Sequence, residues 1–350
     1  MSNLTKGVIE DVSDLEGDGF IVWATWTKDK DDNSIFTNNY ADGFYENVFG
    51  DGGTKVIRTQ GVWKYSPPKY WHRGIYTFAA VLPASTFNAT YSDYTPAELT
   101  NPYGTYTGGV VTNEDNTLSY NPSVITLHLG EEGYDLSAEQ DDIMVAYYNV
   151  DNRSENAPQT TNGVSLNFKH QMSQIAIEAA NIDENIDITI LQIEVSGNHR
   201  SIVGDLVFTP SENNVTANYE LNDSTSLEAP YQIINTPSDP NNSKYDWVMT
   251  KKVSDAELEY DTIVPSLLVF PEECYLSFKV IYTASIPSIH GTTSQPIEGT
   301  VTTSRAVKWR PGVKYAYRLQ ISGQRVDIVS SSIKEWEWEW EDKDIEHEFN

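Results

Sequence analysis

Apolar side chains in this chain recur at every second residue, and this spacing limits the possible folds more than any other feature. In an extended strand, successive side chains point to opposite faces, so a period of two places the apolar residues on one face. Three segments show the pattern clearly: Val164, Leu166 and Phe168; Leu276, Phe278, Val280 and Tyr282; and Tyr315, Tyr317, Leu319 and Ile321. We expect half-buried β-strands at all three.

Other runs are apolar on both phases. Residues 20–26, 75–82 and 143–150 predict central strands that are covered on both faces. Between Ile186 and Val195 the apolar phase slips by one residue, which predicts a β-bulge. We see no long amphipathic helix pattern. Short strands separated by Gly, Pro, Asn and Asp clusters therefore predict an all-β protein, built as a sandwich or a barrel.

The chain is long enough for two domains. It has 350 residues, of which 39% are hydrophobic, and a domain typically takes about 150 residues. Residues 151–163 contain no large apolar side chain and separate two strand-rich halves, so we interpret them as a linker between domains at 1–155 and 156–350. The polar stretches 86–121 and 211–242 are long for β connections and are candidate functional loops.

Charge and cysteine content exclude several classes of function. The chain carries 51 Asp+Glu against 23 Lys+Arg, a formal net charge of -28, and such a surface repels phosphates, so we expect no nucleic acid partner. Cys274 is the only cysteine, which excludes an internal disulfide and a multi-cysteine metal site. No run approaches the roughly 18 apolar residues of a membrane span, so we expect no transmembrane segment. The first residues also lack the apolar segment of a secretory signal.

Four segments, taken in order, carry a family resemblance. They are residues 63–71 leading into 75–83, residues 141–146, residues 164–175, and residues 309–321 followed by 333–336. In this order and spacing they resemble the fimbrillin family of the Mfa-like type, from Gram-negative anaerobes. The resemblance covers nearly the whole chain.

The resemblance implies two tandem transthyretin-like (Greek-key) β-sandwich domains in a fimbrial, or type V pilus, subunit at the cell surface. It further implies export as a lipoprotein, so that the protein is anchored in the outer membrane or secreted. In such pili a subunit loses its first strand, and a neighbour's strand fills the groove, which is donor-strand exchange. The implied partners are other pilus subunits, met through strand addition, and a host or bacterial surface glycan or protein that gives cell adhesion.

Two departures from the stalk pattern favour a tip, accessory or anchoring subunit. The resemblance implies cleavage after an arginine, but the first arginine is Arg58, and cutting there would remove the apolar run at 20–26. Either processing has already happened, another site is used, or this subunit is not processed. The last ten residues contain only Ile345 and Phe349 as large apolar side chains. That segment is a poor donor strand.

Two aromatic segments are candidate ligand or packing surfaces. The first contains Trp63, Tyr65, Tyr70 and Trp71, and the second contains Trp336, Trp338 and Trp340 alternating with glutamates. Large aromatic side chains more often fill cores and interfaces than ligand platforms, so we favour packing. Exposed rings would instead stack on sugars, and the alternative function is therefore a surface glycan-binding module.

We find no positive pattern for an enzyme, a metal site or a cofactor. Residues 29–34 begin like a calcium loop, but Ser34 stands where the turn needs glycine and Tyr40 where the bidentate glutamate should be. The six histidines show no zinc-binding spacing, and His170, on the apolar phase of its strand, is expected to be a core imidazole. A glycoside hydrolase is a third interpretation, because carboxylate pairs meet only in the folded chain.

Overall fold

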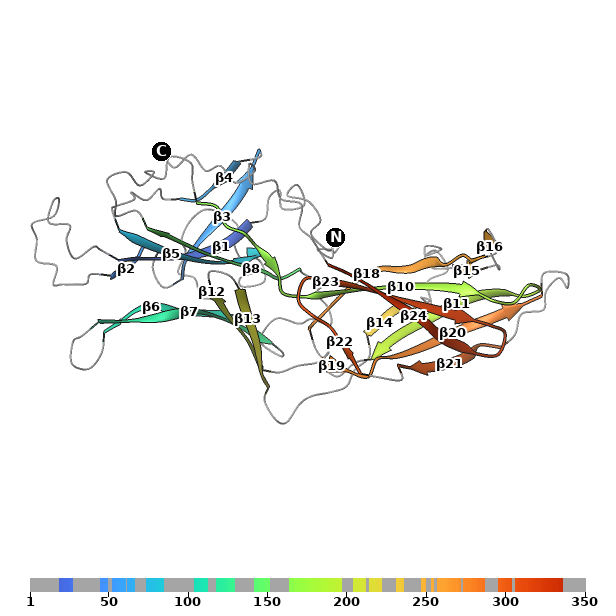
Figure 1. Ribbon diagram of the computed structural model, residues 1–350. Helices are drawn as coiled ribbons and strands as arrows, with labels where there is room; N and C mark the ends of the chain where they lie inside the picture. The colour runs from blue at the N-terminus through green and yellow to red at the C-terminus, as the bar shows by residue number, and fades with distance from the viewer. Residues whose placement is uncertain are drawn as a thin grey trace, which may run out of the picture.

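The computed structural model describes an all-β protein, as predicted. It describes residues 19–27, 45–49, 52–60, 62–66, 74–84, 104–112, 118–129, 142–151, 164–196, 204–211, 214–221, 231–235, 247–249, 253–254, 257–271, 273–286, 295–303 and 306–335. These residues contain no α-helix, and their strands form four sheets and two two-stranded ribbons (Figure 1).

Sheets A and B lie at one end of the elongated molecule (Figure 1). Sheet A has the order β4-β3-β1-β5-β8-β9, with β2 paired to β1, and sheet B has the order β13-β12-β7-β6. The strands of sheet A are β1 (Gly19–Thr27), β2 (Tyr45–Asn47), β3 (Thr54–Thr59), β4 (Val62–Lys64), β5 (Ile75–Leu82), β8 (Met144–Asp151) and β9 (Lys169–His170). Those of sheet B are β6 (Gly104–Thr112), β7 (Leu118–Leu129), β12 (Gly204–Ser211) and β13 (Asn214–Leu221).

Sheets C and D lie at the other end (Figure 1). Sheet C has the order β18-β10-β23-β24, and sheet D has the order β14-β11-β20-β21, with β15 paired to β11. Sheet C consists of β10 (Ser173–Asn181), β18 (Asp261–Val269), β23 (Val313–Ile321) and β24 (Val326–Glu335). Sheet D consists of β11 (Asp187–Ser196), β14 (Tyr231–Asn235), β15 (Trp247–Met249), β20 (Ser277–Ser285) and β21 (Ile297–Thr302). The ribbons pair β16 (Val253–Ser254) with β17 (Glu257–Leu258), and β19 (Glu273–Cys274) with β22 (Val307–Lys308).

The strands predicted from apolar patterns are confirmed for the clearest segments. The run at 75–82 is β5, the runs at 20–26 and 143–150 coincide with β1 and β8 to within a residue, and the alternating segments near 280 and 317 are β20 and β23. The predicted bulge is confirmed in β11, whose register against β20 shifts between Ile190 and Gln192. Local apolar spacing therefore fixes these strands.

The strand predicted at residues 164–169 is wrong for most of its length. Val164, Leu166 and Phe168 are buried and the residues between them are exposed, as alternation requires, but only β9 pairs with a neighbour, at Met144 and Val145 of β8. The Phe168 ring lies 5.1 Å from the ring of Phe20 in β1. Because β5 separates β8 from β1 in the sheet, this segment crosses the face of sheet A instead of extending its edge.

The two long polar stretches are not simply loops, which corrects the prediction. The stretch at 86–121 contains β6 and the start of β7, and the stretch at 211–242 contains β13 and β14. In β13, Val215 and Ala217 are half-buried while Thr216 and Asn218 are exposed. The same phase continues in the sequence with Tyr219 and Leu221, so the alternation of a strand is present here, and reading the whole stretch by its polar composition overlooked it.

Two cores lie between facing sheets. Ile21, Trp23 and Val81 of sheet A pack against Leu127 and Phe208 of sheet B in one cluster. The Trp23 ring stacks on the ring of Tyr106 in β6, with 4.8 Å between centroids and 12° between planes. This cluster holds sheets A and B together as a sandwich.

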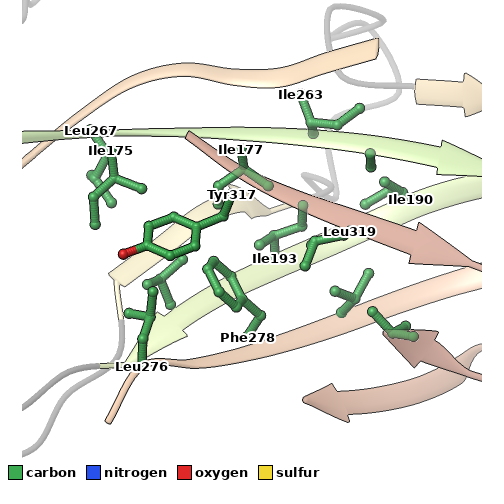
Figure 2. Packing of buried hydrophobic residues seen from close by; sticks show 14 of the residues in the cluster. Ile175, Ile177, Ile190, Ile193, Ile263, Leu267, Leu276, Phe278, Tyr317 and Leu319 are labelled. Atoms are coloured by element: carbon green, nitrogen blue, oxygen red, sulfur yellow. The ribbon is translucent and has the colours of Figure 1, made fainter. Parts of the chain in front are cut away.

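The second core fills the space between sheets C and D. Figure 2 shows Ile177 and Tyr317 of sheet C pointing toward Ile193 and Phe278 of sheet D. The Phe278 and Tyr317 rings are 5.4 Å apart. Burial of these large side chains is the main favourable contribution to folding, at about 25 cal/mol per Å² of apolar surface.

The strands of sheets A and B come from both sides of the predicted domain boundary between residues 155 and 156. β12 follows residue 156, yet it pairs with β7 in sheet B, and β9 pairs with β8 in sheet A. Leu268 and Phe270 also belong to the core cluster of sheets A and B. A cut between 155 and 156 would split both sheets, and the division into two tandem transthyretin-like domains stays a prediction.

Candidate functional site

Trp63, the first residue of the predicted aromatic surface, lies in the core. It sits in β4 with 3% of its surface exposed, and its ring is 5.1 Å from the Phe20 ring. Val62 and Lys64, its neighbours on the strand, are exposed. The alternation of β4 therefore turns the indole into the apolar cluster that contains Phe20, away from solvent.

Tyr65 also contacts the apolar cluster on the outer face of sheet A. It is half-buried, and its ring meets the ring of Phe49 edge-on, with centroids 5.4 Å apart. The remaining predicted residues, Tyr70, Trp71, Trp336, Trp338 and Trp340, lie outside the described residues. The structure thus brings Trp63 and Tyr65 into one cluster, and the aromatic ligand surface stays a prediction.

The prediction that His170 is a core imidazole is confirmed. His170 Nδ1 lies 3.0 Å from Asp142 Oδ1 and 2.9 Å from Asp142 Oδ2, and the side chains are 3% and 0% exposed. An imidazole oriented by a carboxylate also occurs in hydrolytic triads, but this pair is enclosed, so a substrate does not reach it. Asp142 was not predicted as the partner, because the pairing depends on the β8–β9 register.

The same region joins the two ends of the molecule. Residues 171 and 172 connect β9 of sheet A with β10 of sheet C. The Gln171 N–H donates to the Ile143 carbonyl at 2.7 Å, and the Gly312 N–H donates to the Met172 carbonyl at 2.9 Å. The Ser173 hydroxyl donates to the Arg310 carbonyl at 2.8 Å. These hydrogen bonds tie the segment between β9 and β10 to residues 143, 310 and 312, which indicates a structural role.

Two side chains show shifted pKa values with clear causes. Burial raises the pKa of the Tyr282 hydroxyl in β20, and the nearby Asp183 carboxylate raises it further. On the exposed face of sheet C, a hydrogen bond to Glu178 raises the pKa of the Arg318 guanidinium, whose Nε lies 2.6 Å from Glu178 Oε2. Each shift stabilises the protonated form of its group, which is the form present at neutral pH. Neither group is therefore suited to act as a general acid or base. The described residues contain no group of three or more histidine, cysteine or acidic side chains placed to bind a metal.

Among the described residues, β24 forms one edge of sheet C and pairs with a neighbour on one side only. β24 is ten residues long and is the last strand in the order β18-β10-β23-β24. Its register against β23 shifts so that Val329 is an extra residue between Ile328 and Ser330, and this side chain is 46% exposed. An open edge of this length is a template for pairing with another strand.

A family model described as fimbrillin-like matches residues 13–336 of this sequence. This chain belongs to the fimbrillin-like family. The resemblance found in the sequence is therefore confirmed, and the fimbrillin-like assignment identifies a structural protein of the fimbrial, cell-surface class. Among curated proteins, no sequence matches this fimbrillin-like chain.

One solved structure supports the fold of this fimbrillin-like chain. A fimbrial protein from Bacteroides vulgatus is 13% identical, with a TM-score of 0.54, and the match covers 95% of this chain and 98% of that one. Proteins described as cell adhesion proteins, from Bacteroides ovatus and Bacteroides uniformis, are 12% and 13% identical, with TM-scores of 0.37 and 0.38. These matches cover 91% and 95% of this chain and 87% and 97% of the others. No helix suited to crossing a membrane occurs in the described part of the chain.

Proposed function

We propose that this chain is a pilus subunit that occupies a tip, accessory or anchoring position and meets its neighbours by β-strand addition. It would act at the outer surface, anchored in the outer membrane as a lipoprotein or secreted. The observation that carries the proposal is the open edge of β24, because an edge strand offers unpaired N–H and C=O groups to an incoming strand.

The position of β1 supports a terminal subunit over a stalk subunit. β1 pairs with β3 on one side and β5 on the other, and Phe20, Ile21 and Trp23 are 1–2% exposed. A stalk subunit would open its acceptor groove by losing its first strand. Removing β1, the first strand among the described residues, would leave a gap between β3 and β5 that only a donor strand with side chains matching Phe20, Ile21 and Trp23 could fill.

Arg58 is poorly placed for the processing that opens such a groove. It lies inside β3 and pairs with Trp63 of β4. A protease needs an accessible, locally unfolded segment, and a hydrogen-bonded hairpin over a buried tryptophan does not supply one. Strand addition at an outer edge therefore fits this chain better than filling of a vacated groove.

The geometry of β24 also limits where an added strand lies. At the start of β24, the Val326 side chain packs so closely on β21 that a Cβ built on Gly299 would lie 2.6 Å from Val326 Cγ2. The residues from Ile328 onward are further from this contact along the strand. We expect the incoming strand to pair with β24 from Ile328 onward and to pack its apolar side chains against Val329.

The experiment is incorporation of Val329→Lys into fimbriae of the native bacterium. A charge at an edge blocks strand addition, so we expect the variant to be lost from the sheared fimbrial fraction while its expression is unchanged. The matched control is Ile286→Lys, at a side chain that is 43% exposed just beyond β20. Normal incorporation of Val329→Lys would contradict addition at this edge.

Immunogold labelling of a tagged chain tests the position separately. A terminal subunit places the label at one end of each filament. Label along the whole shaft would contradict the tip, accessory or anchoring assignment. It would not contradict strand addition.

A further inference from the structure

The β24 edge of sheet C carries two lysines at opposing positions. Along β23 the inward phase is buried, and the outward phase, Lys314, Ala316, Arg318 and Gln320, is half-buried or exposed. The register of β23 and β24 places Lys334 directly opposite Lys314. Residues that are directly opposite in an antiparallel pair share a face. Lys334 therefore belongs to the outward face of sheet C, on the strand that forms this edge.

Two lysines at these positions are unfavourable in the isolated chain. Like charges directly opposite one another on neighbouring strands repel. The chain has 51 Asp+Glu against 23 Lys+Arg, so lysine is the less common choice of charge. Lysine on an edge strand also blocks pairing with unsuitable strands. A repulsive pair placed at an edge is typical of selection against wrong partners, which is one source of specificity.

Two acidic residues on the outward face of sheet C are held by other cations. Glu178 is on β10, which β23 separates from β24, and its Oε2 lies 2.6 Å from Arg318 Nε. Asp327 is on β24 beyond the bulge, and its Oδ2 lies 2.8 Å from Arg325 Nε. Neither carboxylate belongs to a residue directly opposite a lysine of the pair.

A second copy of β24 does not bring a carboxylate to this face. Opposite β23, the outward positions of β24 are Ser330, Ser332 and Lys334. Glu335 is opposite Val313, which is on the buried phase of β23, so it belongs to the inward face. Pairing between two copies of β24 would therefore add lysine to lysine. The complementary charge has to come from a different strand.

The proposed strand addition would bring such a strand, and the inference rests on that proposal. An incoming strand that pairs with β24 has one residue directly opposite Lys334 on the outward face. A carboxylate there would attract Lys334 and offset its repulsion from Lys314, whereas a lysine or arginine would extend the repulsion to a third strand. We infer that the β24 edge selects an acidic strand, a segment of a partner subunit with Asp or Glu opposite Lys334 and apolar residues at alternate positions.

The test uses the purified, unassembled chain and three short capped peptides, in which valine alternates with glutamate, lysine or glutamine. Fluorescence anisotropy should show the glutamate peptide binding about tenfold more tightly than the lysine peptide, with the glutamine peptide between them, because one cross-strand charge pair changes affinity by up to about fivefold in either direction. Raising the salt concentration should bring the three affinities together. Hydrogen exchange should show that the bound glutamate peptide protects β24.

Variants at Lys334 assign the preference to this position. Lys334→Glu should remove or reverse the preference for the glutamate peptide, whereas Lys334→Arg keeps the charge and should stay within about twofold. Because Lys334→Glu places opposite charges at the two register positions, it should also raise the melting temperature of the free chain by roughly 1–2 °C. A lower melting temperature would contradict the repulsion. The matched control is Lys64→Glu, at an exposed lysine on β4, which is an edge strand of sheet A.

Incorporation into native fimbriae separates this inference from the proposed assembly. Lys334→Glu should be reduced about tenfold in the sheared fimbrial fraction, while Lys64→Glu stays at the level of the unaltered chain. Loss of Val329→Lys together with normal incorporation of Lys334→Glu would overturn the charge selection without contradicting strand addition. Normal incorporation of both variants would contradict addition at this edge and the inference with it.

Two results with the peptides would also overturn the inference. One is equal affinity of the glutamate and lysine peptides with equal protection of β24, which would show an edge that accepts strands of either charge. The other is protection of β24 by none of the three peptides, which would contradict an edge that is open to strands at all.

Discussion

His170 donates a hydrogen bond from Nδ1 to the Asp142 carboxylate at 2.9 Å, and both side chains are almost completely enclosed. The pair fixes the chain segment where sheet A passes into sheet C. Removing one partner would leave a buried polar group without compensation, and such losses are expensive.

We predict that Asp142→Ala lowers the free energy of unfolding by about 3 kcal/mol. Urea denaturation measures the loss. The control is Asp205→Ala, because His128 Nδ1 and Asp205 Oδ1 are as close, at 2.7 Å, but their side chains are 38% and 40% exposed. That exposed pair should contribute less than about 1 kcal/mol. Equal effects of the two substitutions would contradict a structural role for the buried pair.

A second prediction contrasts two buried tyrosines in the same core. Among the described residues, the Tyr282 hydroxyl has no hydrogen-bond partner, whereas the Tyr317 hydroxyl accepts from Trp309 Nε1 at 2.9 Å. Tyr282→Phe should be neutral or stabilise by up to about 1 kcal/mol, while Tyr317→Phe should cost about 1–3 kcal/mol. Thermal and urea unfolding check both, and a large loss for Tyr282→Phe would show that its hydroxyl is used.

The raised pKa of Tyr282 predicts a loss of stability at alkaline pH. Because the folded state holds the Tyr282 proton more tightly than the unfolded state, this contribution is fully present below the ordinary tyrosine pKa of about 10. It is lost as pH rises from there through the folded pKa. Unfolding free energies measured across this range should fall less steeply for Tyr282→Phe than for the unaltered chain. Identical slopes would contradict the shift.

A fourth prediction concerns the close contact between β21 and β24. A Cβ on Gly299 would lie 2.6 Å from Val326 Cγ2 and 3.3 Å from Val326 Cβ, and a β-branched side chain has little freedom to move aside. Gly299→Ala should therefore cost about 1–3 kcal/mol.

Two further variants control this prediction. In Gly323→Ala the new Cβ would meet the flexible end of Ile186 at 3.1 Å and Asp183 Oδ2 at an ordinary contact distance of 3.5 Å, and the cost should be smaller. Adding Val326→Ala to Gly299→Ala should recover part of the loss, because it removes the side chain in the way. A double variant less stable than the sum of the two single changes would contradict this explanation.

The sequence predicted the strands that carry many large apolar residues. The run at 75–82 coincides with β5 because nearly every residue in it is apolar, and the phase slip near Leu191 locates the bulge of β11. β6 was missed because three glycines interrupt its pattern. β13 was missed although Val215, Tyr219 and Leu221 alternate in it, because the stretch around it is polar in composition. The alternation at Val164, Leu166 and Phe168 correctly predicted burial, but the pattern does not distinguish a paired strand from a segment lying across a sheet.

The sites were harder to predict than the strands, because they depend on residues distant in sequence. Trp63 belongs to the core through its contact with Phe20, which the order of sheet A creates. The contact between Asp142 and His170 arises only when β9 pairs with β8. None of these contacts has a local signal in the sequence.

Hydrogen exchange at the amides of β24 tests the proposed assembly most directly. Mass spectrometry would compare the free chain with the same chain recovered from fimbriae, peptide by peptide. An added strand should protect the outward-facing amides between Ile328 and Glu335, while protection of β1 stays unchanged because its strand is retained. Unchanged exchange in β24 on assembly, or loss of the β1 peptides from the assembled chain, would contradict strand addition at this edge.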